Sequence, residues 1–102
     1  MIVIQGYIRT APANAAKFKE AAAPLIAETR KEPGCIEYAF AEDICDAGLF
    51  HIIERWADDA ANTAHGKTPH FVAFSAALPV IGLTGIRIAR YDTETEKVLF
   101  GA

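Results

Sequence analysis

The chain has few cysteines and no long hydrophobic run, and each shortage excludes a class of protein. Cys35 and Cys45 are the only cysteines among 102 residues. Two cysteines cannot form a zinc site alone, and their spacing fits no redox motif. No apolar run reaches the roughly 20 residues that a membrane-spanning helix needs. The N-terminus lacks a basic segment followed by an apolar stretch, so we expect no signal peptide and a cytoplasmic location.

Clusters of positive charge are also missing. The formal net charge is −3, and the lysines and arginines are scattered along the chain. A nucleic-acid surface requires clustered basic residues that displace counterions from phosphates, so we expect no nucleic-acid partner. Asp43 and Asp46 are too few for a calcium loop and are typical of a turn. The sequence therefore predicts no metal site and no membrane association.

Hydrophobic residues, by contrast, are slightly over-represented. They make up 52% of a chain whose length fits one domain, residues 1–102. The surplus indicates either an internal pocket or an apolar surface shared with a partner.

Alternating apolar residues predict four strands, at residues 2–10, 35–41, 49–56 and 85–91. In the first strand the isoleucines share one face with Gly6, which leaves room there for a ligand or a helix to approach. In the second strand, Ile36, Tyr38 and Phe40 are expected to share a face.

Helical spacing predicts three helices. The first covers residues 13–32, with a kink or a loosened turn at Pro24. A short helix over residues 58–64 is capped by Asp58. The third begins at residues 68–69 and runs to about Leu78, where Pro79 is expected to stop it.

The predicted order β-α-β-β-α-α-β is typical of an α+β, ferredoxin-like fold with a four-stranded antiparallel sheet and helices on one face. The uncovered face is expected to carry either Val3, Tyr7, His51 and Ile53 or the residues that alternate with them. Packing this face against a second copy would cover it, so we predict a homodimer. We expect the tail, residues 92–102, to extend over the neighbouring subunit.

Three segments of the chain carry a family resemblance. They are residues 32–38 (EPGCIEY), 54–56 (ERW) and 65–71 (HGKTPHF). On these segments the chain resembles the antibiotic biosynthesis monooxygenases, which are dimeric α+β barrels. The H-x-x-T-P-H spacing is similar to that of the quinol monooxygenase branch and of the phospho-autoinducer isomerase branch.

The resemblance implies oxidation of a small-molecule substrate by O₂ without metal, flavin or haem, so no cofactor is expected. The haem-degrading members of the family have Asn, Trp and His where this chain has Gly6, His65 and Phe74. These differences argue against haem. The leading hypothesis is a cofactor-independent monooxygenase that oxidises a hydroquinone or polyphenol. The alternatives are an isomerase or proton-transfer enzyme acting on a small oxygenated substrate, with or without a phosphate group, and a non-catalytic ligand-binding dimer.

Such an oxidation needs a base, and His65, His70 and Glu54 are the candidates for it. His65 could instead cap the short helix, and His70 could pack on Phe74. Glu54 lies among apolar residues, where a carboxylate is costly unless it is paired. The structural alternative for Glu54 is an ion pair with Arg87 or Arg90, or exposure at the end of the sheet.

A further set of residues is expected to line the substrate pocket. Trp56 could stack on a planar ring, and Tyr38 could donate a hydrogen bond to a substrate oxygen. The same residues could equally be plain core, and Asn62 could be an exposed helical residue. The substrate-binding candidates are Trp56, Tyr38, Phe71, Phe74 and Asn62.

Overall fold

The protein forms one four-stranded sheet and three helices, connected in the predicted order. The computed structural model describes residues 1–101. The elements are β1 (Ile2–Thr10), a short 3-10 turn η1 (Pro12–Asn14), α1 (Ala15–Thr29), β2 (Cys35–Glu42), β3 (Leu49–Trp56), α2 (Asp59–His65), α3 (Pro69–Ile81) and β4 (Leu83–Asp92).

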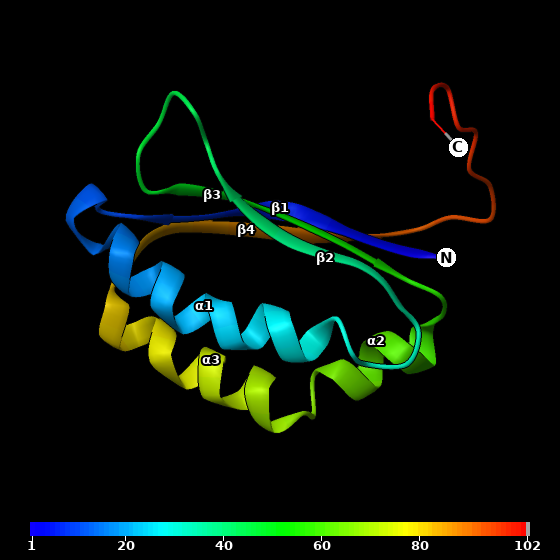
Figure 1. The fold of residues 1–102 in the computed structure, drawn as a ribbon, viewed down its shortest axis with the longest axis horizontal. Helices are drawn as coiled ribbons and strands as arrows, with labels where there is room; N and C mark the ends of the chain where they lie inside the picture. The colour runs from blue at the N-terminus through cyan, green and yellow to red at the C-terminus, as the bar shows by residue number, and fades with distance from the viewer. Residues whose placement is uncertain (102) are drawn as a thin grey trace.

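The sheet has the strand order β2-β3-β1-β4, and every neighbouring pair is antiparallel. All three helices lie on one side of it (Figure 1). The predicted α+β, ferredoxin-like fold is therefore confirmed.

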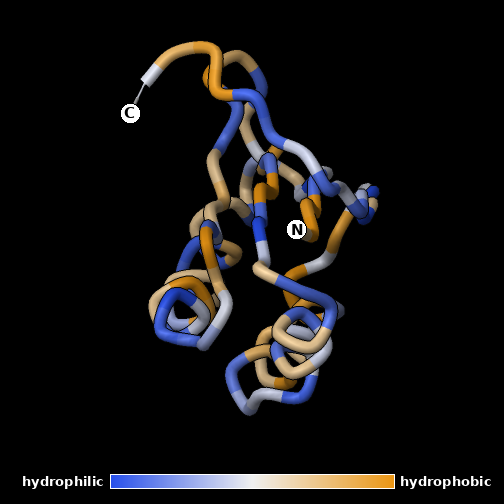
Figure 2. The backbone as a smooth tube through the Cα atoms, turned by 90° about the vertical axis from the view of Figure 1, so that its right-hand side faces the viewer, coloured by the Kyte–Doolittle hydropathy of each residue, from blue (hydrophilic) through white to orange (hydrophobic). Residues whose placement is uncertain are grey.

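The core lies between the helices and the sheet face that β1, β2 and β3 turn toward them. α1 contributes an apolar stripe, with Phe18 and Leu25 almost fully buried. The strands contribute Ile8, Ile52 and Trp56, which are also buried. Figure 2, turned by 90° from Figure 1, shows hydrophobic residues distributed along both the helices and the strands. Alternation along β3 thus places Glu54 and Trp56 on the helix side of the sheet.

No helix covers the opposite face of the sheet within residues 1–101 (Figure 1). The strand register places Val3, Tyr7, His51 and Ile53 on this face, which is the first of the two expected sets. Ile53 and His51 are exposed. The chain beyond β4 leads away from the helices and ends in exposed Val98 to Phe100. None of the described helices is both long enough and apolar enough to cross a membrane.

The structure corrects the helix boundaries. Pro12–Asn14 forms a separate 3-10 turn before α1, and α1 ends at Thr29 rather than near residue 32. α1 is continuous across Pro24. Pro79 does not end α3, which continues to Ile81 and is followed by Gly82 at a φ of 81°. A proline removes only one helical hydrogen bond, and near a helix end the remaining contacts can keep the helical path.

The prediction that Ile36 shares a face with Tyr38 and Phe40 is also wrong. The pairing of β2 with β3 shifts register between Cys35 and Glu37. This irregularity interrupts the alternation, and Ile36 is half-exposed while Tyr38 is buried. The sequence pattern alone treats the strand as regular and cannot show the shift.

Gly6 accommodates a neighbouring strand rather than a ligand or a helix. A Cβ atom at Gly6 would meet the carbonyl oxygen of Arg87 and the Cα of Ile88, both in the β4 backbone. We expect Gly6→Ala to reduce the free energy of unfolding by about 1–3 kcal/mol, because the β1–β4 ladder must shift. Denaturant titration measures the loss.

Gly85→Ala is the matched control for this substitution. Its Cβ would meet only side-chain atoms, at 3.6 Å from Arg9 and 3.7 Å from Tyr7, which is ordinary contact. Its effect should stay below about 1 kcal/mol. Equal losses for both variants would contradict the assigned role of Gly6.

Candidate active site

Two histidines and one glutamate form a compact group of titratable side chains on the helix side of the sheet. Glu32 lies in the loop after α1, His65 is the last residue of α2, and His70 is in the first turn of α3. The Oε2 atom of Glu32 is 2.8 Å from Nδ1 of His65 and 2.8 Å from Nε2 of His70. We call these three residues the carboxylate–imidazole cluster.

The corner between α2 and α3 fixes the spacing of the two histidines. Asp58 caps α2, where its side chain accepts a hydrogen bond from the backbone N–H of Ala61 at 2.8 Å. Thr68 caps α3 and accepts from the N–H of Phe71. The Thr68 hydroxyl also donates to the carbonyl of His65 at 2.8 Å, which ties the end of α2 to the start of α3.

A second corner brings Glu32 to the histidines. Gly34 has a φ of 83°, a conformation that glycine adopts without strain. A Cβ there would lie 2.5 Å from the Cβ of Ala61 in α2, so the absence of a side chain permits close contact. The carbonyl of Gly34 also accepts from the N–H of Ala57 at 2.8 Å. The loop after α1 is therefore held against α2.

The ring of His65 is enclosed by aromatic side chains. Its centroid lies 4.9 Å from that of Trp56, 5.2 Å from Tyr38 and 4.9 Å from Phe71. His65 is only 4% exposed. Its Nε2 atom is buried and has no hydrogen-bond partner among the described residues. Native buried polar atoms seldom lack a partner, so this atom requires an explanation.

When Glu32 is ionised and His65 is neutral, Nδ1 carries the proton that the carboxylate accepts. The lone pair then lies on Nε2, the unpartnered atom. This is the arrangement of a general base that a carboxylate orients. His70 shares the same carboxylate oxygen and is more exposed than His65, with 19% of its side chain accessible.

Glu54 and Trp56 form a buried pair next to this cluster. The indole Nε1 of Trp56 donates to Oε1 of Glu54 at 2.9 Å. Glu54 is 7% exposed, and burial raises the pKa of its carboxyl group, while the Trp56 hydrogen bond and the charge of His65 act in the opposite direction. Because burial favours the neutral, protonated form of the carboxyl group, Glu54 is a candidate proton donor.

The expected alternative for Glu54, an ion pair with Arg87 or Arg90, is wrong. Arg90 pairs with Asp59 at 2.6 Å and with Asp92 at 2.7 Å. Arg87 lies opposite Tyr7, on the face of the sheet away from the helices. The indole of Trp56 satisfies the carboxyl group of Glu54 instead.

Of the other predicted site residues, two contact His65 and two lie apart from the carboxylate–imidazole cluster. Tyr38 and Phe71 contact His65, and burial is the main cause that raises the pKa of the Tyr38 hydroxyl. Phe74 packs on Phe18 and Phe40 in the core. Asn62 is half-buried on α2 and does not belong to the carboxylate–imidazole cluster.

Sequence reasoning missed Glu32. The resemblance includes it in residues 32–38, but Glu32 precedes His65 and His70 by 33 and 38 positions. No periodicity within one element connects it to them. Only the fold, which brings the loop after α1 against α2, reveals the contact.

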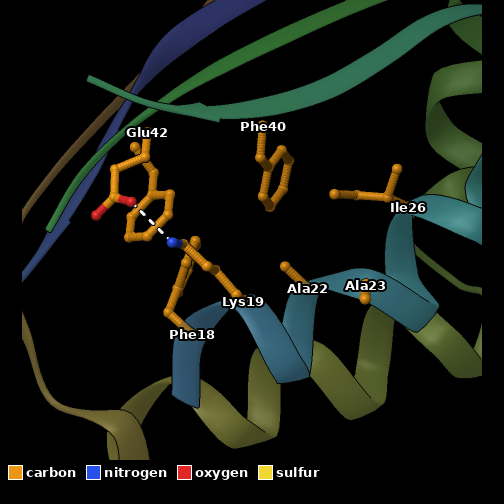
Figure 3. Close-up of a pocket in the computed structure, with 8 residues that line it drawn as sticks. Phe18, Lys19, Ala22, Ala23, Ile26, Phe40 and Glu42 are labelled. Atoms are coloured by element: carbon orange, nitrogen blue, oxygen red, sulfur yellow. Dashed lines mark ion pairs between the residues drawn. The ribbon is translucent and has the colours of Figure 1, made fainter. Parts of the chain in front are cut away.

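Two pockets lie near the cluster or are linked to it by aromatic contacts. An apolar groove of about 250 Å³ between α1 and α3, the helix groove, is lined by His70, Phe74, Leu25, Pro24 and alanine side chains. A second pocket, of about 240 Å³, lies between α1 and β2 (Figure 3). There Phe18, Phe40 and Ile26 form the wall, and Lys19 pairs with Glu42 at 2.8 Å. Phe40 contacts Tyr38, which contacts His65.

The cluster is also the group that could hold a metal ion. One ligand atom from each of Glu32, His65 and His70 lies within 4.8 Å of the others. The arrangement therefore permits two kinds of chemistry: proton transfer by an oriented imidazole, or coordination of a cation.

Comparison with known proteins identifies the family. The family model described as "Antibiotic biosynthesis monooxygenase" matches residues 1–77. "Putative monooxygenase YcnE" of Bacillus subtilis is 36% identical over 76 residues, which cover 74% of this chain and 80% of that protein.

Solved structures agree with this match. A "putative antibiotic biosynthesis monooxygenase" from Deinococcus radiodurans has a TM-score of 0.90 and 26% identity, covering 99% of this chain and 100% of its own. A structure from Pseudomonas aeruginosa has a TM-score of 0.82 and 32% identity, with 92% and 94% covered. The chain belongs to the antibiotic biosynthesis monooxygenase family.

Proposed function

We propose that the protein is a cofactor-independent monooxygenase that oxidises a hydroquinone or polyphenol with O₂, and that His65 is the base. The observation that carries the proposal is the state of the His65 ring. Its Nδ1 is 2.8 Å from a carboxylate oxygen, and its Nε2 is buried without a partner. A substrate hydroxyl placed at Nε2 would supply the missing hydrogen bond.

The chemistry needs little more than such a base. Nε2 accepts the proton of a ring hydroxyl, and the resulting phenolate gives electrons to O₂ far more readily than the neutral phenol. One oxygen atom of O₂ enters the ring and the other leaves as water, so that hydroquinone and O₂ give a hydroxyquinone and H₂O. All four electrons that O₂ takes up come from the substrate, and no external reductant is required.

The surroundings of His65 suit this reaction. Tyr38, Trp56 and Phe71 exclude water from the ring, which protects reactive oxygen intermediates from side reactions. Glu32 fixes the ring, and His70 lies between Glu32 and the helix groove, where it could exchange protons with solvent.

Oxygen uptake by the purified protein tests the proposal. With menadiol-like hydroquinones we expect O₂ consumption well above autoxidation, and isotopically labelled O₂ should place one labelled atom in the product. Turnover should stop under anaerobic conditions. Conversion that continues without O₂ would indicate an isomerase. Binding without turnover across a broad hydroquinone panel would indicate a ligand-binding protein.

We further propose that the protein is a homodimer that packs through the uncovered face of the sheet. Ile53 and Tyr91 are exposed on this face, and Val3 and Tyr7 are only half-buried. The exposed Val98, Leu99 and Phe100 of the tail would gain a partner surface in the same assembly.

A further inference from the structure

The carboxylate–imidazole cluster differs from the other histidine–carboxylate contact of the protein. His51 approaches Asp43 at 2.8 Å on the surface, with nearly half of the His51 side chain exposed. That contact has one histidine and one carboxylate. In the cluster, two histidines from different helices meet one carboxylate oxygen, and at most 19% of any of the three side chains is exposed.

The separations in the cluster are close to those of a metal site. Zinc binds nitrogen and oxygen at about 2.0–2.2 Å, so tetrahedral ligand atoms lie roughly 3.3 Å apart. The two contacts of Glu32 Oε2 are 2.8 Å, and the three ligand atoms are within 4.8 Å of one another. Shifts on the order of 0.5 Å in Glu32 and His70 would open a position for the ion. These two side chains are the more exposed members of the cluster.

The ligand types select a class of ion. Two imidazoles and one carboxylate suit first-row transition metals such as Zn²⁺, Co²⁺ or Fe²⁺, whereas Mg²⁺ and Ca²⁺ prefer oxygen ligands. Three protein ligands leave a position for water or a small molecule.

The charges around the cluster also favour a cation. Within residues 1–101, the ion-pair partners of Glu32 are the two histidines, and no lysine or arginine neutralises it. An ion can reach the cluster through His70, which lines the helix groove.

We propose that Glu32, Nδ1 of His65 and Nε2 of His70 form a binding site for a divalent transition-metal ion. An ion on Nδ1 would displace the proton from that atom, so the neutral ring would carry its proton on Nε2. The lone pair that the base needs would then be lost. Metal binding would therefore inhibit the proposed oxidation. The inhibition rests on the proposed function, whereas the binding does not.

Calorimetric titration of the metal-free protein with Zn²⁺, and absorption spectra with Co²⁺, test the binding directly. We expect one ion per chain. His70→Ala and Glu32→Gln should each weaken the affinity by at least the roughly 10- to 100-fold that loss of an outer ligand partner costs in other proteins. His51→Ala, the matched control, should bind like the unmodified protein. Thermal denaturation verifies that each variant folds.

The possible results separate the two proposals. Absence of Zn²⁺ binding, or equal binding by the unmodified protein and both cluster variants, overturns the metal site and leaves the oxidation untouched. Zn²⁺ binding that weakens in the cluster variants supports the site. If that bound ion leaves O₂ uptake unchanged, the site stands and the assignment of His65 as the base fails.

Discussion

Replacing His65 with glutamine is expected to lower kcat for hydroquinone oxidation by about 10²- to 10⁴-fold, the range typical for loss of a general base. Glutamine keeps a planar polar group that can still donate to Glu32, so the packing against Trp56 and Phe71 changes little. It has no nitrogen lone pair that accepts a proton at neutral pH. Steady-state O₂ uptake measures the loss.

His51→Gln is the control for this substitution. His51 also contacts a carboxylate, Asp43, at 2.8 Å, but it lies on the opposite face of the sheet. Its oxidation rate should match that of the unmodified protein. Comparable losses in the two variants, or a His65 variant that changes KM alone, would show that His65 does not take up the substrate proton.

Replacing Trp56 with alanine is expected to reduce the free energy of unfolding by about 3–5 kcal/mol, as for other large buried aromatic residues. Trp56 is 0% exposed and contacts both Tyr38 and His65. The substitution opens a cavity and also removes the hydrogen-bond donor of the buried Glu54. Urea denaturation measures the loss.

Trp56→Phe helps to separate these two effects, since it keeps an aromatic ring and leaves a smaller cavity than alanine while it deletes the indole N–H group. Burial raises the pKa of Glu54 above its value in the unfolded chain, and the Trp56 hydrogen bond lowers it. The stability linked to Glu54 is fully present below the unfolded pKa and is lost as the pH rises through the folded pKa. Without the hydrogen bond the folded pKa rises further.

The loss in Trp56→Phe should therefore be about 1–3 kcal/mol at neutral pH and smaller in acid. In a Glu54→Gln background, where no carboxyl group titrates, the pH dependence of that loss should disappear. A loss that is the same at both pH values in the unmodified background would mean that the indole N–H does not control the charge of Glu54.

The sequence predicted the fold well because the relevant signals are local. The apolar alternation of β1 and β3 can be recognised within a few residues, and so can the Thr68–Pro69 start of α3. These three elements lie where the sequence places them. The errors arose where a local rule does not hold in the folded chain. Helix α3 passes Pro79 because the loss of one hydrogen bond near a helix end is tolerated. The shifted pairing of β2 with β3 leaves Ile36 half-exposed.

The candidate site could be predicted only in part, because its residues come from segments that are far apart in the sequence. His65, His70, Tyr38, Trp56 and Phe71 were expected together, and the structure does bring them together. Glu32, which orients both histidines, was not expected to take part. Its partners lie beyond the whole β2–β3 hairpin, and no spacing rule covers that distance. The partner of Glu54 was missed because Arg87 faces the other side of the sheet and Arg90 pairs with Asp59 and Asp92, which leaves the indole N–H of Trp56 as the donor.

The separation of Glu32 from its histidines also affects how the protein is made. The ribosome releases Glu32 well before His70, and the intervening hairpin must close before the three side chains can meet. A nascent or partly unfolded chain therefore has no oriented imidazole. If the proposed oxidation is correct, such chains would not generate reactive quinones, and redox activity would begin only with the completed fold.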